Sequence, residues 1–344
     1  MVKLARSRVP AGRPRSDESM LLPDHSYLKS ESLEKCLKLL AEKGERTMIV
    51  AGGTDVIFNM RLKLFSPEVA LSIRNIRELQ SVEALDDGSL RIGAGARLAD
   101  LLERPDINGR WPAFSESIRA VASTHIRNMA TLGGNICLHT RCSYTNNSEE
   151  WRKGLKDCFK TEGQLCHVIR SSDSCLAINN ADTPVALIMH GAVLTIQSVN
   201  GSREVPIAEF YTSDGVDNTV LGPGEIVTYV TLPPTDDRTV FLKLAPRKGM
   251  DFSTAAVAAR ADGSGDGPCT ITIVLGSVSS CPIRLDKPAR VASEKGLGDD
   301  AIAEAISHVR GELGCVTNLF SRASYKKQMA SVMVKRALVA LREQ

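Results

Sequence analysis

The spacing of hydrophobic residues divides the first part of the chain into helices and short strands. Residues 30–44 place leucines and a cysteine on one helical face, and Gly44 ends this helix. Apolar runs at 47–50 and 68–73 predict buried strands, and residues 81–95 predict a β-hairpin.

The pattern changes from about residue 238 onwards. Residues 239–247, 253–261 and 269–279 predict three antiparallel strands. Two amphipathic helices follow, at 299–313 and 324–343, and the apolar stripe of the second is typical of a helix packed on a core.

Composition narrows the class of protein. A chain of 344 residues with 43% hydrophobic and 24% charged residues is typical of a globular protein of two or three domains. Its formal charge of +3 is too small to indicate nucleic-acid binding. No apolar run approaches the roughly 20 residues of a membrane-spanning helix.

The first 20 residues combine five basic side chains with proline and glycine and have no apolar core. They predict a disordered basic tail rather than a secretory signal. We therefore expect a cytoplasmic protein, in which cysteines stay reduced.

Two glycine pairs suggest an anion site. "VAGGTD" (50–55) directly follows a strand, and "TLGGN" (131–135) repeats the pattern. Glycine permits positive φ and close approach of a ligand, so that successive N–H groups can converge on an anion. One such pair is usually only a turn, whereas two suit a diphosphate held from two sides. Neither matches the Rossmann or P-loop spacing, so these residues alone indicate only a nucleotide cofactor.

Four of the nine cysteines gather in one segment, with the spacing C-x15-C-x7-C-x8-C from Cys142 to Cys175. Thiolates are soft ligands, and four of them suit an iron–sulfur cluster or a tetrahedral zinc ion. The segment lacks a C-x2-C pair, so its spacing leaves open a cluster, zinc or unligated thiols. His167 is a weaker candidate ligand, and Cys137 reads as a buried thiol outside the set.

Six segments occur in an order that resembles one family: "IVAGGTDV", "THIRNMATLGGN", "NNADTPVAL", "GEIVTYVTLP", "FLKLAPRKGMDFSTAAVAA" and "SYKKQMASVMVKRAL". Together they resemble the FAD-binding medium subunit of the molybdenum hydroxylases, the group that contains carbon monoxide dehydrogenase and xanthine dehydrogenase. The resemblance runs from about residue 22 to 342.

The resemblance implies an α+β protein with a vanillyl-alcohol-oxidase-type (PCMH) FAD-binding fold. Two α/β subdomains, 21–75 and 76–236, would hold FAD, and residues 237–344 would form the C-terminal α+β domain with a three-stranded antiparallel sheet. The second subdomain would carry an insert at about 138–178.

The resemblance also implies the residues that hold FAD. The pyrophosphate would lie between two groups, Ala51, Gly52, Gly53, Thr54 and Asp55 on one side and Thr131, Gly134 and Asn135 on the other. Asp182 would lie on the adenosine side, and Ile226 or Val227 together with Lys243 would lie near the isoalloxazine. The alternatives are a helix N-cap for Asp182 and a solvated strand position for Lys243. No histidine occurs in "VAGGTD", so we expect dissociable FAD.

The insert resembles that of the β subunit of 4-hydroxybenzoyl-CoA reductase. This resemblance implies a [4Fe–4S] cluster on Cys142, Cys158, Cys166 and Cys175. It implies no catalytic residue in this chain. Electrons from a ferredoxin-like donor would pass through the cluster and FAD to partner subunits, a [2Fe–2S] small subunit and a molybdopterin-binding large subunit.

In this interpretation a dimer of heterotrimers removes a phenolic hydroxyl from an aromatic acyl-CoA. Two alternatives stay open. The chain could be the FAD subunit of an oxidative hydroxylase that delivers electrons to NAD or a quinone. It could also be a zinc-binding scaffold without enzymatic activity.

Overall fold

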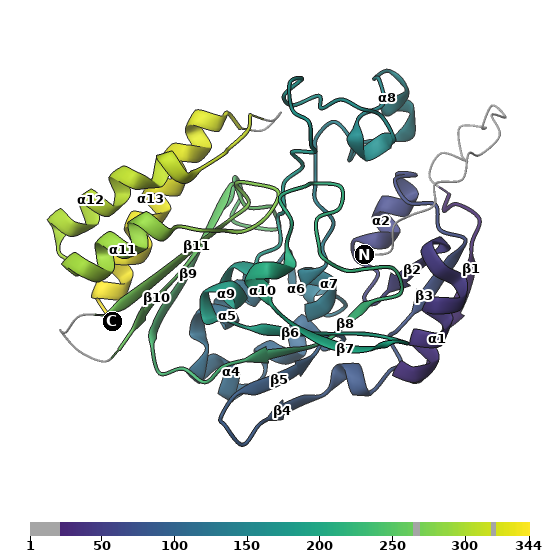
Figure 1. Cartoon of the computed structure of the whole chain (residues 1–344), viewed down its shortest axis with the longest axis horizontal. Coiled ribbons are helices and arrows are strands. Elements are labelled where there is room, and N and C mark those ends of the chain that lie inside the picture. Colours follow the sequence, from purple (N-terminus) through teal and green to yellow (C-terminus); the bar gives the residue numbers. More distant parts are fainter. Residues whose placement is uncertain (1–20, 264–268, 318–320) are drawn as a thin grey trace.

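The computed structural model describes residues 21–263, 269–317 and 321–344. The described residues form three sheets, each built from one stretch of the sequence (Figure 1). The predicted basic tail over 1–20 lies outside the described residues. We keep the proposed division near residues 75 and 236, because each sheet draws its strands from one of the three ranges.

The first sheet is parallel, with the order β1-β3-β2. The predicted helix over 30–44 is confirmed: Ser32 caps its start by accepting the N–H of Lys35, and Gly44 ends it with φ +59°. Cys36 and Leu40 on its inner face are buried against Leu71. The elements are β1 (Ser26–Lys29), α1 (Leu33–Lys43), η2 (Gly44–Arg46), β2 (Thr47–Val50), α2 (Val56–Arg61) and β3 (Val69–Ser72).

The second sheet is antiparallel, with the order β4-β5-β8-β6-β7. The predicted hairpin is present, and Gly88 has φ +80° at its turn. The strands are β4 (Val82–Ala84), β5 (Leu90–Gly93), β6 (Val193–Ser198), β7 (Gly201–Pro206) and β8 (Ile226–Leu232). The helices are η3 (Glu78–Gln80), α3 (Leu98–Leu102), α4 (Pro105–Arg110), α5 (Pro112–Arg119), α6 (Thr124–Arg127), α7 (Leu132–Ile136), α9 (Thr183–His190) and α10 (Ile207–Phe210).

The third sheet is antiparallel, with the order β12-β11-β10-β9, and three helices pack beside it (Figure 1). Its elements are β9 (Arg238–Leu244), β10 (Ala255–Asp262), β11 (Thr270–Gly276), β12 (Ile283–Arg284), α11 (Asp286–Lys295), α12 (Asp299–Val309), η5 (Arg310–Glu312) and α13 (Ala323–Arg342). The sequence predicted three of these strands and two of these helices. β12 is too short to show a period, and α11 buries only Pro288 and Ala292.

The segment 138–178 projects from the second subdomain and carries α8 (Glu149–Lys153) and η4 (Phe159–Thr161) (Figure 1). Arg141 and Ile178 exchange two backbone hydrogen bonds of 2.8 Å at its base. Arg152 donates to the carbonyl of Leu62 at 2.7 Å, which fixes the segment against the end of α2.

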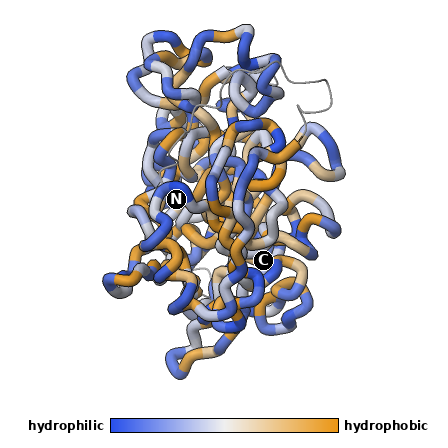
Figure 2. The backbone as a smooth tube through the Cα atoms, turned by 90° about the vertical axis from the view of Figure 1, so that its right-hand side faces the viewer, coloured by the Kyte–Doolittle hydropathy of each residue, from blue (hydrophilic) through white to orange (hydrophobic). Residues whose placement is uncertain are grey.

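Hydrophobic stretches run through the middle of the molecule, and hydrophilic ones occupy many outer loops (Figure 2). None of the described helices has the length and apolar character needed to cross a membrane.

Candidate functional site

The twelve predicted cofactor residues all line one cavity of about 530 Å³. This volume lies within the usual range of about 300–1,000 Å³ for small-molecule sites. The first sheet, the second subdomain and the start of the C-terminal domain all contribute to its wall. Residues that lie up to 192 positions apart in the sequence, from Ala51 to Lys243, therefore face one space.

The first glycine pair leaves backbone groups available to a ligand. Gly53 has φ +73°, and a Cβ on Gly52 would lie 2.0 Å from the carbonyl oxygen of Met129. Within the described part of the chain, no hydrogen bond engages the N–H groups of Gly52, Gly53 and Thr54. Glycine is thus required both by conformation and by close packing, and three N–H groups can meet an anion.

The second glycine pair differs from this expectation. It lies in α7, a short helix capped by Thr131, whose Oγ1 accepts the N–H of Gly134 at 3.2 Å. The N–H groups of Leu132 and Gly133 donate to carbonyls of Ala96 and Ala94. The expectation that this segment repeats the first turn is wrong, because its N–H groups already bond within the protein. Gly133 is needed for packing, since its Cβ would lie 2.7 Å from that of Ala94.

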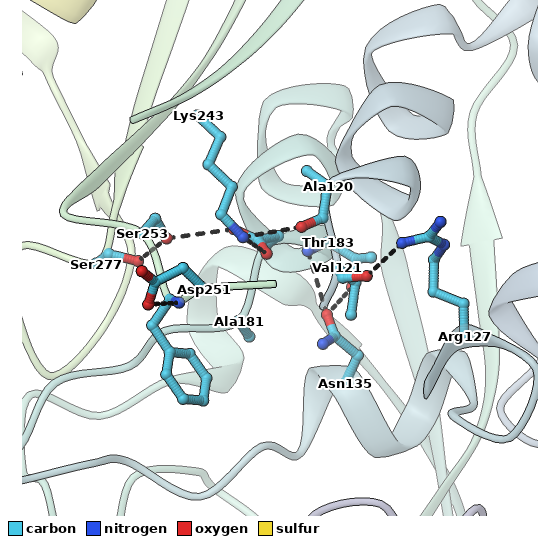
Figure 3. Close-up of polar contacts among 12 residues, drawn as sticks. Ala120, Val121, Arg127, Asn135, Ala181, Thr183, Lys243, Asp251, Ser253 and Ser277 are labelled. Carbon is cyan, nitrogen blue, oxygen red and sulfur yellow. Dashed lines mark hydrogen bonds and ion pairs between the residues drawn. The ribbon is translucent and has the colours of Figure 1, made fainter. Parts of the chain in front are cut away.

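Asn135 connects α7 to the next predicted residue of the site. Its Oδ1 accepts the N–H of Thr183 at 3.2 Å and the hydroxyl of Thr183 at 2.6 Å (Figure 3). Thr183 begins α9, directly after Asp182. This contact positions the start of α9 at the cavity wall.

Asp182 and Lys243 form a buried ion pair. Lys243 Nζ donates to Asp182 Oδ2 and to the Ala120 carbonyl, both at 2.8 Å, and Ser253 Oγ donates to Asp182 Oδ1 at 3.3 Å (Figure 3). Burial raises the pKa of Asp182, and the charge of Lys243 opposes this rise. The two side chains therefore hold each other in place inside the cavity wall.

Both alternatives for this pair are wrong. Asp182 occupies the N-cap position of α9, but its side chain makes no capping hydrogen bond, and Lys243 is only 14% exposed. The resemblance assigned the two residues to opposite ends of FAD, whereas in the structure their side chains are in direct contact.

Arg141 is a cavity residue that the sequence did not reveal. Its guanidinium pairs with Asp55 and lies over the ring of Phe252, 4.7 Å from the ring centre. Burial raises the pKa of Asp55, and Arg141 opposes this rise. Arg141 immediately precedes Cys142 at the base of the insert, so that segment also contributes to the cavity wall. Because Arg141 stands next to the cysteine pattern in the sequence, its place in the cavity wall was not predicted.

The four predicted metal ligands, Cys142, Cys158, Cys166 and Cys175, line a second, small pocket. All four are free thiols, and Cys166 and Cys175 are each 6% exposed. Burial raises the pKa of Cys175 to about 11 and also raises that of Cys142, and the nearby Lys160 opposes both shifts. The four thiols therefore line one pocket, and two of them are buried.

Side chains around this pocket have other partners. His167 Nε2 contacts the Lys156 carbonyl at 2.8 Å, and its ring stacks on Tyr144. Among residues 21–263, 269–317 and 321–344, no group of three or more histidine, cysteine, aspartate or glutamate side chains converges as ligands of a single metal ion would.

Comparison with known proteins places this chain in a family. Residues 23–235 match the FAD binding domain in molybdopterin dehydrogenase, and residues 240–341 match the CO dehydrogenase flavoprotein C-terminal domain. The chain belongs to the family of FAD-binding subunits of molybdopterin dehydrogenases. This family of oxidoreductase subunits uses FAD, and the resemblance inferred from the sequence is confirmed at this level.

Two relatives match most of this chain and nearly all of their own length. The Escherichia coli (strain K12) aldehyde oxidoreductase FAD-binding subunit PaoB is 30% identical over 86% of this chain and 93% of its own length. The Sulfolobus acidocaldarius glyceraldehyde dehydrogenase medium chain is 27% identical over 92% and 98%.

Solved structures support the fold. A carbon monoxide dehydrogenase chain from Hydrogenophaga pseudoflava aligns with a TM-score of 0.78 at 25% identity, covering 94% of this chain and 99% of that one. The predicted FAD-binding fold with a C-terminal α+β domain is therefore confirmed.

The residues present fit FAD. Unused N–H groups beside a closely packed glycine loop suit a pyrophosphate, and the buried Asp182–Lys243 pair offers both an acceptor and a donor. Ile226 and Val227 are 5% and 3% exposed on β8 and supply an apolar wall. The cavity thus combines anion binding at one part with apolar contact at another.

Proposed function

We propose that this FAD-binding subunit transfers electrons between FAD and a [4Fe–4S] cluster held by Cys142, Cys158, Cys166 and Cys175. The observation that carries this proposal is that four cysteines from one segment line a single pocket, in which Cys166 and Cys175 are buried. The same segment supplies Arg141 to the flavin cavity. A redox centre in the pocket would therefore adjoin the flavin site.

A cluster and a zinc ion require different spacings of the four thiols. A tetrahedral zinc ion with Zn–S bonds of about 2.3 Å requires sulfurs only about 3.8 Å apart. A cubane cluster bonds each thiolate to a different iron and holds the sulfurs further apart. Among the described residues no group of three or more possible ligands is placed to hold a metal ion, so the choice of a cluster over zinc rests on the resemblance of the insert.

For FAD, we propose that the N–H groups of Gly52, Gly53 and Thr54 hold the pyrophosphate. Asp55, paired with Arg141, would fix this loop, and Thr131, Gly134 and Asn135 would close the opposite wall. Asp182 and Lys243 would bind one polar part of the cofactor, with Ile226 and Val227 against its apolar part. When bound, FAD exchanges electrons singly or in pairs, and the chain contributes position and electrostatics.

The finer proposal concerns the complex. The resemblance of the insert to 4-hydroxybenzoyl-CoA reductase supports a subunit that receives electrons from a ferredoxin-like donor. It would pass them to a [2Fe–2S] small subunit and a molybdopterin-binding large subunit, in a dimer of heterotrimers that reduces an aryl-CoA.

A second candidate function is the FAD subunit of an oxidative hydroxylase. The names of the relatives favour it: an aldehyde oxidoreductase, a glyceraldehyde dehydrogenase and a carbon monoxide dehydrogenase. In that case electrons leave through this subunit to NAD or a quinone.

Metal and flavin analysis of the purified chain tests the first proposal. Iron and acid-labile sulfide of about four each per chain, with one FAD, is the expected result. Zinc in place of iron would support the scaffold alternative instead. Reconstitution with the two partner subunits then separates the directions: turnover of aryl-CoA with reduced ferredoxin supports reduction, and turnover of an aldehyde with NAD or a quinone supports oxidation.

A further inference from the structure

Two buried serines of the C-terminal domain complete the hydrogen bonding of Asp182. Ser253 precedes β10, and Ser277 follows β11. Ser253 Oγ donates to Asp182 Oδ1 at 3.3 Å, and the hydroxyls of Ser253 and Ser277 lie 2.6 Å apart (Figure 3). A hydroxyl has one proton, and Ser253 gives its proton to the carboxylate, so Ser277 is the donor in the shorter hydrogen bond. The three groups therefore form a directed chain from Ser277 through Ser253 to Asp182.

Ser277 adopts a backbone conformation that glycine would adopt without strain. Its φ is +64°, in the left-handed region. Strained residues of this kind occur at functional sites, where the surrounding structure holds them. The preceding Gly276 packs closely on α9, because a Cβ there would clash with the side chain of Val185. The end of β11 is thus fixed against α9, and the hydroxyl of Ser277 gives this position a use for a side chain despite the strain.

Asp182 connects this chain to an unused donor in the cavity. Its Oδ2 accepts from Lys243 Nζ, which also donates to the Ala120 carbonyl. An ammonium has three donors, and among the described residues only these two acceptors are bonded to it. Lys243 lines the cavity, so its third donor is available to a ligand there. Rotation of the carboxylate would release Lys243 and change the direction of this donor.

We propose that Ser277 and Ser253 are positioning residues that hold the Asp182 carboxylate so that Lys243 directs its third donor to FAD. This inference rests on the proposed contact of Asp182 and Lys243 with the cofactor. With the serines in place, each carboxylate oxygen has a donor. A buried charge that lacks such partners is costly, so loss of one donor favours a different arrangement of the pair.

Titration of the flavin-free full chain with FAD at pH 7 tests this role. Ser253→Ala removes the donor to Asp182 and should weaken FAD binding about tenfold. Ser277→Gly removes only the group that holds Ser253 and should weaken binding roughly threefold. The double variant should bind FAD no more weakly than Ser253→Ala, because Ser277 acts through Ser253.

The pH dependence of FAD binding adds a readout that a loss of folding would not shift in this way. Burial raises the pKa of Asp182, and Lys243 and the hydrogen bond from Ser253 oppose this rise. The Arg247–Asp251 ion pair also lines the cavity and stays the same in each variant. In Ser253→Ala the pKa of Asp182 should rise further. On the acidic side, FAD binding should therefore begin to weaken at a higher pH than in the wild type.

Thermal unfolding of the flavin-free chain separates positioning from folding. In Ser277→Gly, relief of the left-handed backbone offsets the lost hydrogen bond, so the Tm should stay close to that of the wild type while FAD binding falls. Lys63→Gly is the matched control, because Lys63 also has a positive φ, +54°, and takes no part in the chain of hydroxyls. It should bind FAD with wild-type affinity.

The outcomes distinguish the inference from the proposed function. Wild-type FAD affinity in Lys243→Met would overturn the proposed contact of the ion pair with FAD. Weak binding in Lys243→Met, with wild-type affinity and pH profile in both serine variants, would overturn only the positioning role. That role would also be overturned if the two losses add in the double variant, or if FAD loss in Ser277→Gly accompanies a fall in Tm.

Discussion

The flavin cavity and the cysteine pocket are formed from different parts of the chain. Three sheets and the loops between them surround the cavity, and its anion-binding part is backbone. The cysteine pocket comes from side chains of the single segment 138–178. Backbone sites depend on close packing of glycines, whereas side-chain sites depend on individual ligands. Single substitutions should therefore damage one site and leave the other intact.

Replacing Cys158 with serine should have the largest effect. A hydroxyl deprotonates at far higher pH than a thiol, so the cluster loses one of four ligands. We expect iron per chain to fall from about four to near zero, with FAD content unchanged. Cys269→Ser and Cys315→Ser, in the C-terminal domain, are the controls and should keep iron. Retention of the cluster spectrum in Cys158→Ser would contradict the proposed ligand set.

Gly52→Ala should damage the flavin site instead. The added Cβ would lie 2.0 Å from the Met129 carbonyl oxygen, so the whole loop must move. We expect FAD to bind about 100-fold more weakly, or about 2.7 kcal/mol, while iron is retained. Equilibrium dialysis of FAD measures this. Gly109→Ala, at an exposed helical position with no atom nearby, is the control and should bind FAD normally. Unchanged FAD affinity in Gly52→Ala would remove this loop from the site.

Arg141→Met tests the link between the two regions. The substitution leaves Asp55 without its cation and removes the guanidinium from the ring of Phe252. We expect FAD to bind about tenfold more weakly, which corresponds to roughly 1.4 kcal/mol. The pKa of Asp55 should rise further, because Arg141 lowers it. Arg170→Met, which removes an exposed charge from the insert, should leave FAD affinity unchanged. If Arg141→Met and Arg170→Met bind FAD with equal affinity, the Arg141 side chain has only a structural role and does not strengthen FAD binding.

Gly134→Ala should have the smallest effect. Its φ is not positive, and an added Cβ meets only the hydroxyl of Thr131, at 3.0 Å. A slight shift of this cap costs at most about 1 kcal/mol. We expect a reduction in FAD affinity of less than about fivefold, equivalent to that cost. A loss as large as that of Gly52→Ala would mean that the second glycine pair binds the pyrophosphate as directly as the first.

The twelve residues that the resemblance assigned to FAD all line the cavity, because each comes from a short segment that resembles the family. "VAGGTD" follows a strand, and "NNADTP" begins a helix, so the residues could be found without long-range geometry. The sequence could not show that Asp182 and Lys243, 61 positions apart, form a contact. It also could not separate the two glycine pairs, because the N–H groups of the second bond to Ala94 and Ala96, which belong to a distant loop.

The paired backbones of Arg141 and Ile178 bring the two ends of the insert side by side. Because the segment leaves and returns at one point, a short turn is enough to connect the surrounding chain. The entropy of loop closure also changes slowly with the length of the loop. Residues 142–177 could thus be exchanged for a tight turn while Arg141 stays in the cavity wall. The Arg141–Ile178 pair should therefore also accept an insert of different chemistry at this position.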